Sequence, residues 1–446
     1  MASTYISKTL GSGNTRTWTW SGWLKRSTLD GTGDGLLFGA SSDDYNVNYF
    51  DISLTSQNKI NINDYQGVSA FRYITNRDFR DTNAWYHIVI RFDSTQSTAS
   101  DRCRLYINNV QETSFSTQND PSLNFDALIN SNVLHQMGGR TGAFMDCVMS
   151  HIHFCDGQSY APTEFGETDA TTGIWKPKTA PSVTYGTNGF FLKFENSGSM
   201  GTDSSGNANN FTVNGTMTQT IDTPSNVFAT FNPLHKGDQL GDATFSNGNL
   251  THQGTTSGAS YPYTFSTLAA SQGKWYAEFK RVSGETMIGI ASGIADQFLG
   301  NATAAKGYAM FISGQVYYDG SSINYGNALN NNDIVGVAMD LDNNKLYFSI
   351  NGVWQNSGDP TSGATGTGAV SITAPADNGR GVYHFAGGKA GNTITNLQSN
   401  FGNGYFGTTA VASAQNPDDG IGIFEYSVPT GYKALCTKSI NAQEYD

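Results

Sequence analysis

The sequence carries little charge, and most of that charge is acidic. Asp, Glu, Lys and Arg make up 14% of its 446 residues, against about 25% in an ordinary soluble domain. The formal net charge is −12, and no run of Lys or Arg occurs. Nucleic acids are held by clustered cations that displace counterions from the phosphates. We therefore expect no nucleic-acid partner.

Long apolar runs are missing as well. No stretch approaches the about 20 apolar residues of a membrane span. The first residues, Met1 to Gly13, lack the apolar segment of a secretory signal peptide. We expect no membrane insertion, and folding in the cytoplasm.

Cysteine is scarce, with only Cys103, Cys147, Cys155 and Cys436 in the whole chain. Four irregularly spaced cysteines are too few for a disulfide framework in a chain of this length. Cys147 and Cys155 are separated by about 26 Å if the segment between them is extended, which is too far for a bridge. We expect free thiols.

Turn-forming and strand-forming residues dominate what is present. Glycine occurs 51 times and aromatics make up 12% of the chain, while Asn, Ser and Thr recur throughout. Clusters of these turn residues leave almost no place for a helix of ten or more residues. Aromatic and β-branched side chains suit a pleated, half-buried surface. The composition predicts an all-β protein.

One pattern occurs twice: a strand, a polar turn, a second strand, a two-residue turn and a third strand. It covers Trp85–Asp93 and Arg104–Val110 in the first half, and Asp333–Asp340 and Lys345–Trp354 in the second. The second two-residue turn is Asn351-Gly352, a strong hairpin signal because a type I′ turn requires positive φ at both positions. A repeat this far apart indicates a domain duplication or a shared fold rather than a solenoid.

Several segments of the first half resemble laminin-G-like, concanavalin-type domains that are common in structural proteins of marine tailed phages. These segments are Trp18–Leu24, Ala84–Val89, Leu105–Asn108 and Phe154–Gln158, with Phe165–Asp169, Gly173–Pro177 and Tyr185–Phe190 resembling segments that accompany such domains. The second half resembles a SPRY domain through Gly273–Phe279, Ile288–Ile290, Gly307–Tyr308 and Ile334–Gly352.

The resemblance implies two concanavalin-like antiparallel jelly-roll β-sandwiches in tandem. We expect the first sandwich with its linker at residues 1–225, the second at 226–410, and a C-terminal tail at 411–446. The part after about Gly420 has little of its own to bury, and we expect it to pack on a neighbour. Laminin-G modules often hold calcium between loops, but those ligands cannot be matched to residues of this sequence. We assign no metal.

Acidic residues offer no catalytic arrangement. Some concanavalin-like folds are glycanases with carboxylates at i, i+2 and i+4 of one strand, where they share a face. The nearest cluster here is Glu164, Glu167 and Asp169, in which the spacing puts Glu164 on the opposite face, and Pro162 and Gly166 indicate a loop. We expect no catalytic residues.

Two further groups have the residue types of a metal site. His151 and His153 alternate on an expected strand and could chelate zinc with a third ligand, but none is visible nearby, which favours a half-buried polar face. Asp203, Asn207 and Asn209 offer oxygens suited to calcium. Asp and Asn are also ordinary turn formers, and that interpretation is favoured.

Aromatic residues divide into two groups. Tyrosines in expected loops can stack on sugars through their ring faces; these are Tyr65, Tyr73, Tyr317, Tyr318 and Tyr325. Tryptophans in strand patterns are expected in the core; these are Trp20, Trp23, Trp85, Trp275 and Trp354. Alternation does not separate the two groups, so no ligand-binding residues are assigned.

The resemblance implies a virion structural protein without enzymatic activity or cofactor: a capsid or tail appendage or fibre that decorates the particle or adheres to a host-surface glycan. Its partners would be other virion proteins and a host glycan or receptor. Such appendages are commonly symmetric homo-oligomers, trimers among them. The alternatives are a cellular carbohydrate-binding adhesin and a glycanase, since one fold hosts all of these.

Overall fold

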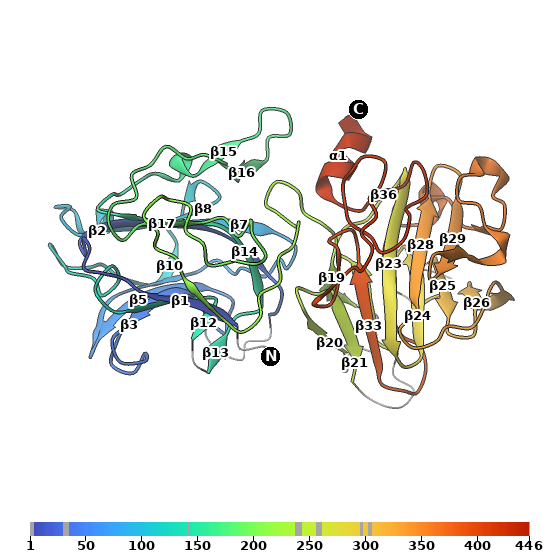
Figure 1. The fold of residues 1–446 in the computed structure, drawn as a ribbon, viewed down its shortest axis with the longest axis horizontal. Helices are drawn as coiled ribbons and strands as arrows, with labels where there is room; N and C mark the ends of the chain where they lie inside the picture. The colour runs from blue at the N-terminus through green and yellow to red at the C-terminus, as the bar shows by residue number, and fades with distance from the viewer. Residues whose placement is uncertain are drawn as a thin grey trace. The chain divides into compact units, whose positions relative to one another are not determined.

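The computed structural model describes residues 4–29, 35–140, 142–236, 243–255, 261–294, 298–301 and 306–445. The chain divides into two compact units, Met1–Gln219 and Thr220–Asp446. The domain boundary expected near residue 225 thus lies a few residues after the observed division. Both units consist of β-sheets (Figure 1), and the expected all-β fold of antiparallel sandwiches is confirmed.

The first unit has two large sheets. The eight-stranded sheet runs in the order β10 (Phe115–Asn119), β6 (Ser69–Thr75), β5 (Ile60–Gln66), β4 (Asn48–Leu54), β3 (Gly35–Ser41), β11 (Leu134–Met137), β1 (Tyr5–Thr9) and β18 (Thr212–Asn214). The six-stranded sheet runs in the order β17 (Phe190–Leu192), β14 (Cys147–Asp156), β2 (Thr17–Arg26), β7 (Trp85–Asp93), β8 (Cys103–Ile107) and β9 (Val110–Gln111).

The first unit also contains short elements. Two small hairpins join β12 (Gly139–Arg140) to β13 (Ala143–Phe144) and β15 (Gly166–Thr168) to β16 (Trp175–Pro177). Two 3-10 turns lie at Ala99–Asp101 and Pro162–Glu164.

The first core forms between the two large sheets. Alternation along β2 turns Trp18, Trp20 and Leu24 inward, and Trp18 stacks on Phe92 of β7 with ring centroids 4.8 Å apart. Full burial of a large apolar side chain such as Phe stabilises the fold by about 1.5–3 kcal/mol. Gly22 leaves room for this packing, because a Cβ there would lie 2.6 Å from Ile152 Cδ1.

The second unit also has two large sheets. One has the order β19 (Phe231–Lys236), β22 (Tyr263–Ser266), β32 (His384–Lys389), β24 (Thr286–Ala291), β25 (Gly307–Phe311), β26 (Gln315–Tyr318) and β27 (Ser321–Asn324). The other contains β20 (Ala243–Ser246), β21 (Thr251–Gly254), β33 (Thr395–Asn400), β23 (Lys274–Ser283), β28 (Ile334–Asp340), β29 (Lys345–Ile350) and β30 (Val353–Trp354), with β31 (Val370–Ser371) beside β29 and β36 (Lys433–Ala434) beside β23.

The remaining described elements of this unit are short. They are the hairpin of β34 (Tyr405–Phe406) and β35 (Thr409–Ala410), the 3-10 turns Gln355–Ser357, Gly363–Thr365 and Pro375–Asp377, and the helix α1 (Thr437–Tyr445). No helix among the described residues is both long and apolar enough to cross a membrane.

The two repeated patterns form equivalent parts of the two units. In the first, β2, β7, β8 and β9 are consecutive neighbours; in the second, β23, β28, β29 and β30 have the same order. Both two-residue turns adopt positive φ, at 48° and 68° for Asn108 and Asn109, and at 49° and 79° for Asn351 and Gly352. Positive φ at both positions is what a type I′ turn requires.

The C-terminal segment packs on a neighbouring sheet, as expected, but it buries more of its own side chains than expected. Phe424, Tyr432 and Cys436 are buried in a cluster with Tyr276 of β23 and Tyr347 of β29. Strand β36 adds a parallel ladder to β23. The sequence does not reveal this burial, because single aromatic residues separated by glycines and prolines show neither the alternation of a strand nor the period of a helix. The segment is part of the second sandwich.

Candidate functional site

A polar groove lies on the face of the eight-stranded sheet that points away from the core. Every second side chain of β4 and β5 joins the core, so the intervening ones face the groove. The register pairs them in three rows across the two strands: Tyr49 with Tyr65, Asp51 with Asn63, and Ser53 with Asn61. The groove has a volume of about 160 Å³.

Hydrogen bonds join the polar side chains of the groove into one network. Asp51 accepts bonds from Ser53 Oγ at 2.5 Å, from Asn61 Nδ2 at 2.9 Å and from Asn63 Nδ2 at 3.4 Å. Arg72 Nε of β6 donates to Asn61 Oδ1 at 2.8 Å. Asp51 is only 9% exposed. The network fixes these side chains before any ligand arrives, which lowers the entropy cost of binding.

Three tyrosines form an aromatic wall beside this network. Tyr49 and Tyr65 stack with centroids 5.3 Å apart, and Tyr45 lies 5.7 Å from Tyr49. The guanidinium of Arg140 lies 4.6 Å from the ring centroid of Tyr45. Burial raises the pKa of Tyr49, and the negative charge of Asp51 raises it further. The phenol therefore stays neutral and can both donate and accept hydrogen bonds.

The loop before β4 holds Tyr45 in a constrained conformation. Tyr45 has a φ of 62°, in the left-handed region that costs energy for a residue with a Cβ. Its backbone N–H donates to Ser41 Oγ at 2.7 Å. The Asp43 carboxylate accepts from the N–H groups of Val47 at 2.9 Å and Asn48 at 3.0 Å. These bonds close the loop over the groove.

The carboxyl groups of the groove bear on the chemistry that it offers. Among the described residues that line it, Asp51 is the one carboxylate. Glycoside hydrolysis by the usual route requires two carboxyl groups on opposite sides of the bond that breaks. The arrangement instead combines aromatic faces with fixed hydrogen-bonding groups.

A buried serine and histidine on the other sheet resemble a nucleophile and its base, but their protons are arranged the wrong way. Trp175 Nε1 donates to His87 Nδ1 at 3.0 Å. Since an indole N–H only donates, the imidazole proton lies on Nε2, which donates to Ser21 Oγ at 2.9 Å. A catalytic histidine must accept the serine proton there. Burial, with a contribution from His151, lowers the pKa of His87 to about 3.

His151 and His153 lie in an aromatic setting. Their ring centroids are 6.0 Å and 3.9 Å from that of Phe191. His153 Nδ1 is 2.9 Å from Tyr185 Oη, and burial lowers the pKa of His153 well below its usual value. Within the described residues, no three His, Cys, Asp or Glu side chains are grouped as metal ligands.

The oxygens of Asp203 are used by the chain itself. The carboxylate accepts from the N–H groups of Phe191, Ser205 and Asn209, each at 2.8 Å. Asn207 and Asn209 both donate through their side-chain amides to Gly189 O at 2.9 Å. These contacts are those of the turn-forming interpretation.

The carboxylates of Glu164, Glu167 and Asp169 do not form one site. Glu164 ends a 3-10 turn, whereas Glu167 lies in β15 and Asp169 follows it. Lys176 Nζ lies 2.8 Å from Asp169 and 3.8 Å from Glu167. The hydrogen bond from Lys176, with those from Thr172 and Thr171, holds the pKa of Asp169 well below its usual range.

The other singled-out residues are mostly structural. All four cysteines are free thiols. Trp20 and Trp275 are in the cores, as expected, and Trp85 is buried, while Trp354 packs only partly against the C-terminal cluster. Trp23 is buried on the opposite face of β2, where it stacks on His87.

Of the five tyrosines predicted as possible sugar contacts, only Tyr65 lines the groove. Tyr73 and Tyr325 are buried, and Tyr317 and Tyr318 are half-buried in β26. The sequence reasoning missed the other groove residues. The sequence feature that could have indicated them is a row of outward side chains, Tyr, Asp and Ser in β4, which pairs with Tyr, Asn and Asn in β5. Such a row is unusually rich in hydrogen-bonding groups for a solvent-facing strand.

One protein family matches part of the first unit. A family model described as "Concanavalin A-like lectin/glucanases superfamily" (Laminin_G_3) matches residues 2–150. No curated protein sequence matches the chain.

Three solved structures are among those similar to the chain. The SPRY domain of human HERC1 is 12% identical, with a TM-score of 0.30, covering 38% of this chain and 96% of that domain. Stonustoxin is 18% identical, with a TM-score of 0.28, covering 39% and 27%. The TRIM65 PSpry domain is 10% identical, with a TM-score of 0.26, covering 39% and 88%. Residues 2–150 of the first unit therefore match the concanavalin A-like lectin/glucanases superfamily model, and the chain is an all-β protein of antiparallel sandwiches.

Proposed function

We propose that this protein binds a glycan through the groove over β4 and β5, without catalysis, and acts as a surface-contact protein. The observation that carries the proposal is the paired set of groove residues: stacked Tyr49 and Tyr65 beside the hydrogen-bonded Asp51 and Asn63. A sugar ring has an apolar face and a rim of hydroxyls. Tyrosine rings suit the first, and fixed carboxylate and amide groups suit the second.

The size of the groove sets the scale of the contact. Pockets for drug-sized ligands have volumes of about 300–1,000 Å³, whereas this groove has about 160 Å³. It accommodates one or two sugar units of a longer chain. Affinity for one copy would be modest, so several copies on one particle would bind through multivalency.

A glycan array probed with the full chain, followed by calorimetry with the best ligand, tests the proposal. Tyr65→Ala should weaken binding about tenfold or more, because it removes one stacking face. Tyr318→Ala, the same change in the second unit, is the matched control and should leave binding unchanged. Binding that survives Tyr65→Ala and Asp51→Ala together would refute the groove as the site.

The setting we propose is a virion, where the protein would serve as a capsid or tail appendage or fibre. This rests on the resemblance to phage structural proteins and on the low-charge composition rich in Asn, Ser, Thr and Gly. Other virion proteins and copies of this chain would be its partners. Peptides of this chain in purified particles, found by mass spectrometry, are the expected result. Their consistent absence would favour a cellular adhesin.

A further inference from the structure

A second polar pocket lies on the first unit, on the outer face of the six-stranded sheet. Six residues line its volume of about 210 Å³: Arg91, Asp93, Gln96, Asp101, Arg104 and Ser159. Its two arginines are directly opposite each other, Arg91 on β7 and Arg104 on β8. Like charges in directly opposed positions destabilise a sheet. Two cations in such positions are unexpected in a chain with so few.

The two arginines differ in how their charge is balanced. Arg104 Nη2 lies 2.5 Å from Asp101 Oδ1 and forms an ion pair with it. Arg91 Nη2 donates to the carbonyl of Ser159 at 3.2 Å. The Asp93 carboxylate, two residues away, already accepts from Thr95 Oγ1 at 2.6 Å and from Gln96 Nε2 at 2.5 Å. Arg91 is thus the cation of the pocket whose charge is least compensated.

Both guanidinium groups also retain unused donors. The Nε atoms of Arg91 and Arg104 are buried and have no hydrogen-bond partner within the described residues. A buried donor without a partner costs about 1–3 kcal/mol. Because these Nε atoms have no surface open to solvent, an oxyanion in the pocket would instead accept from the two Nη atoms of one guanidinium in a two-point contact.

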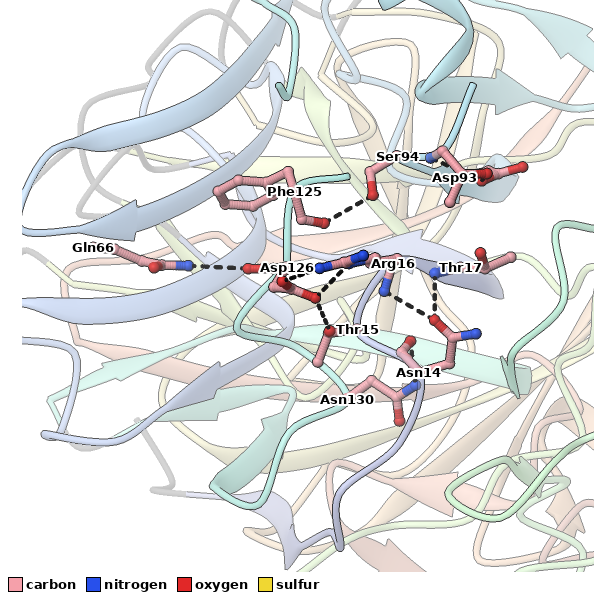
Figure 2. Close-up of polar contacts among 11 residues, drawn as sticks. Asn14, Thr15, Arg16, Thr17, Gln66, Asp93, Ser94, Phe125, Asp126 and Asn130 are labelled. Carbon is pink, nitrogen blue, oxygen red and sulfur yellow. Dashed lines mark hydrogen bonds and ion pairs between the residues drawn. The ribbon is translucent and has the colours of Figure 1, made fainter. Parts of the chain in front are cut away.

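Arg16 lies near this pocket, and its guanidinium is paired with a carboxylate. Figure 2 shows Arg16 facing Asp126 in a two-point ion pair, Nε to Oδ1 and Nη2 to Oδ2, both at 2.8 Å. Thr15 Oγ1 donates to the same carboxylate at 2.8 Å. Thr17, which follows Arg16 and begins β2, pairs with Asp93 of the pocket lining. Arg16 therefore provides a matched control for Arg91.

We propose that this pocket binds a singly charged oxyanion carried by a sugar, a carboxylate or a sulfate ester, with Arg91 as its principal contact. This pocket is separate from the groove over β4 and β5 and lies on the other sheet. Asp93 and Asp101 in its lining disfavour a doubly charged phosphate, and the acidic chain disfavours a polyanion. Gln96 and Ser159 supply neutral polar groups suited to hydroxyls.

Calorimetry of the full chain with three probes tests this proposal: methyl glucuronide, methyl glucoside 6-sulfate and neutral methyl glucoside. At least one acidic sugar should bind more tightly than the neutral one. Arg91→Gln should weaken that binding about tenfold or more, whereas Arg16→Gln should not. Arg91→Lys keeps the charge but loses the planar two-point contact, so it should give an intermediate loss even if Arg91→Gln fails to fold.

Three results would overturn the proposal. They are equal binding of all three sugars, no binding of either acidic sugar to the wild-type chain, and acidic-sugar binding unchanged in both Arg91→Gln and Arg91→Lys. Tyr65→Ala distinguishes this pocket from the groove. It should leave the binding of acidic sugars here intact while removing glycan binding there.

Discussion

Asp51 and Glu278 show two uses of a carboxylate that the fold largely withdraws from water. Asp51 faces the groove and is held by side chains of β4 and β5. Glu278 of β23 is completely buried and accepts from the backbone N–H groups of Glu425 at 2.8 Å and Tyr426 at 2.9 Å. The first carboxylate belongs to the groove for which we propose glycan binding, and the second fastens the C-terminal segment.

Glu278 should give the second unit a pH-dependent stability. Burial, partly offset by hydrogen bonds from the backbone of Glu425 and Tyr426, raises its pKa from 4.5 to about 7. The folded state then binds more protons than the unfolded state between these values. The free energy of unfolding should therefore fall, by up to about 3 kcal/mol, as the pH rises from about 4.5 to about 7.

Urea titrations of wild type and Glu278→Gln at pH 5 and pH 8 measure this contribution. Gln does not titrate, so the variant should show a smaller difference in stability between the two pH values. Asp64, whose pKa burial raises to about 6, contributes with the same sign to both proteins and cancels in the comparison. An identical pH dependence in the two proteins would contradict the assignment.

Gly39 controls the shape of the groove at the scale of one atom. It pairs with Asp51 across β3 and β4, and a Cβ on it would lie 2.6 Å from Phe50 O and 2.6 Å from Tyr45 Oη. Gly39→Ala should displace Tyr45, destabilise the first unit by about 1–3 kcal/mol and weaken glycan binding. Gly198→Ala is the control, because its nearest contact would be an ordinary 3.4 Å. Unchanged melting and binding in Gly39→Ala would refute this role.

At the scale of elements, the sequence predicted the strands and turns whose residues follow a local pattern. The strands of the two repeated patterns and their Asn-Asn and Asn-Gly turns are found where expected. Alternation and positive φ depend on the types of residues adjacent in the sequence, so both can be predicted locally. The groove was not predicted beyond Tyr65. Its residues come together only when β4 and β5 pair in one register, and that register depends on the rest of the sheet.

The sequence did not show which strands the C-terminal segment contacts, for a related reason. Its aromatic residues stand singly among turn residues, so no local pattern shows that they share a cluster with Tyr276 and Tyr347. The contact is made by pairing β36 with a strand far away in the sequence. Long-range pairing of this kind leaves no periodic trace.

Removal of residues 421–446 should therefore damage the second unit. The deletion removes the buried side chains of Phe424, Tyr432 and Leu435, each contributing about 1.5–3 kcal/mol, and exposes Tyr276 and Tyr347. We expect aggregation or a large fall in the melting temperature of the truncated chain, measured by calorimetry against full-length protein. A truncated chain that melts like the wild type would contradict this role of the C-terminal segment.

At the scale of the whole molecule, two units of related strand order share one chain. Polar pockets lie on both outer faces of the first unit, one over β4 and β5 and one beside Arg91. The chain carries few charged residues, with an acidic balance, and is rich in neutral polar residues. Such a surface suits contact with uncharged or weakly acidic partners.

The most direct test of glycan binding by the groove is a crystal structure of the full chain with the best ligand from the array. We predict density for a sugar ring against Tyr49 and Tyr65, with hydroxyls within hydrogen-bond distance of Asp51 and Asn63. Density for that ligand elsewhere on the molecule, with the groove holding only water, would contradict the account.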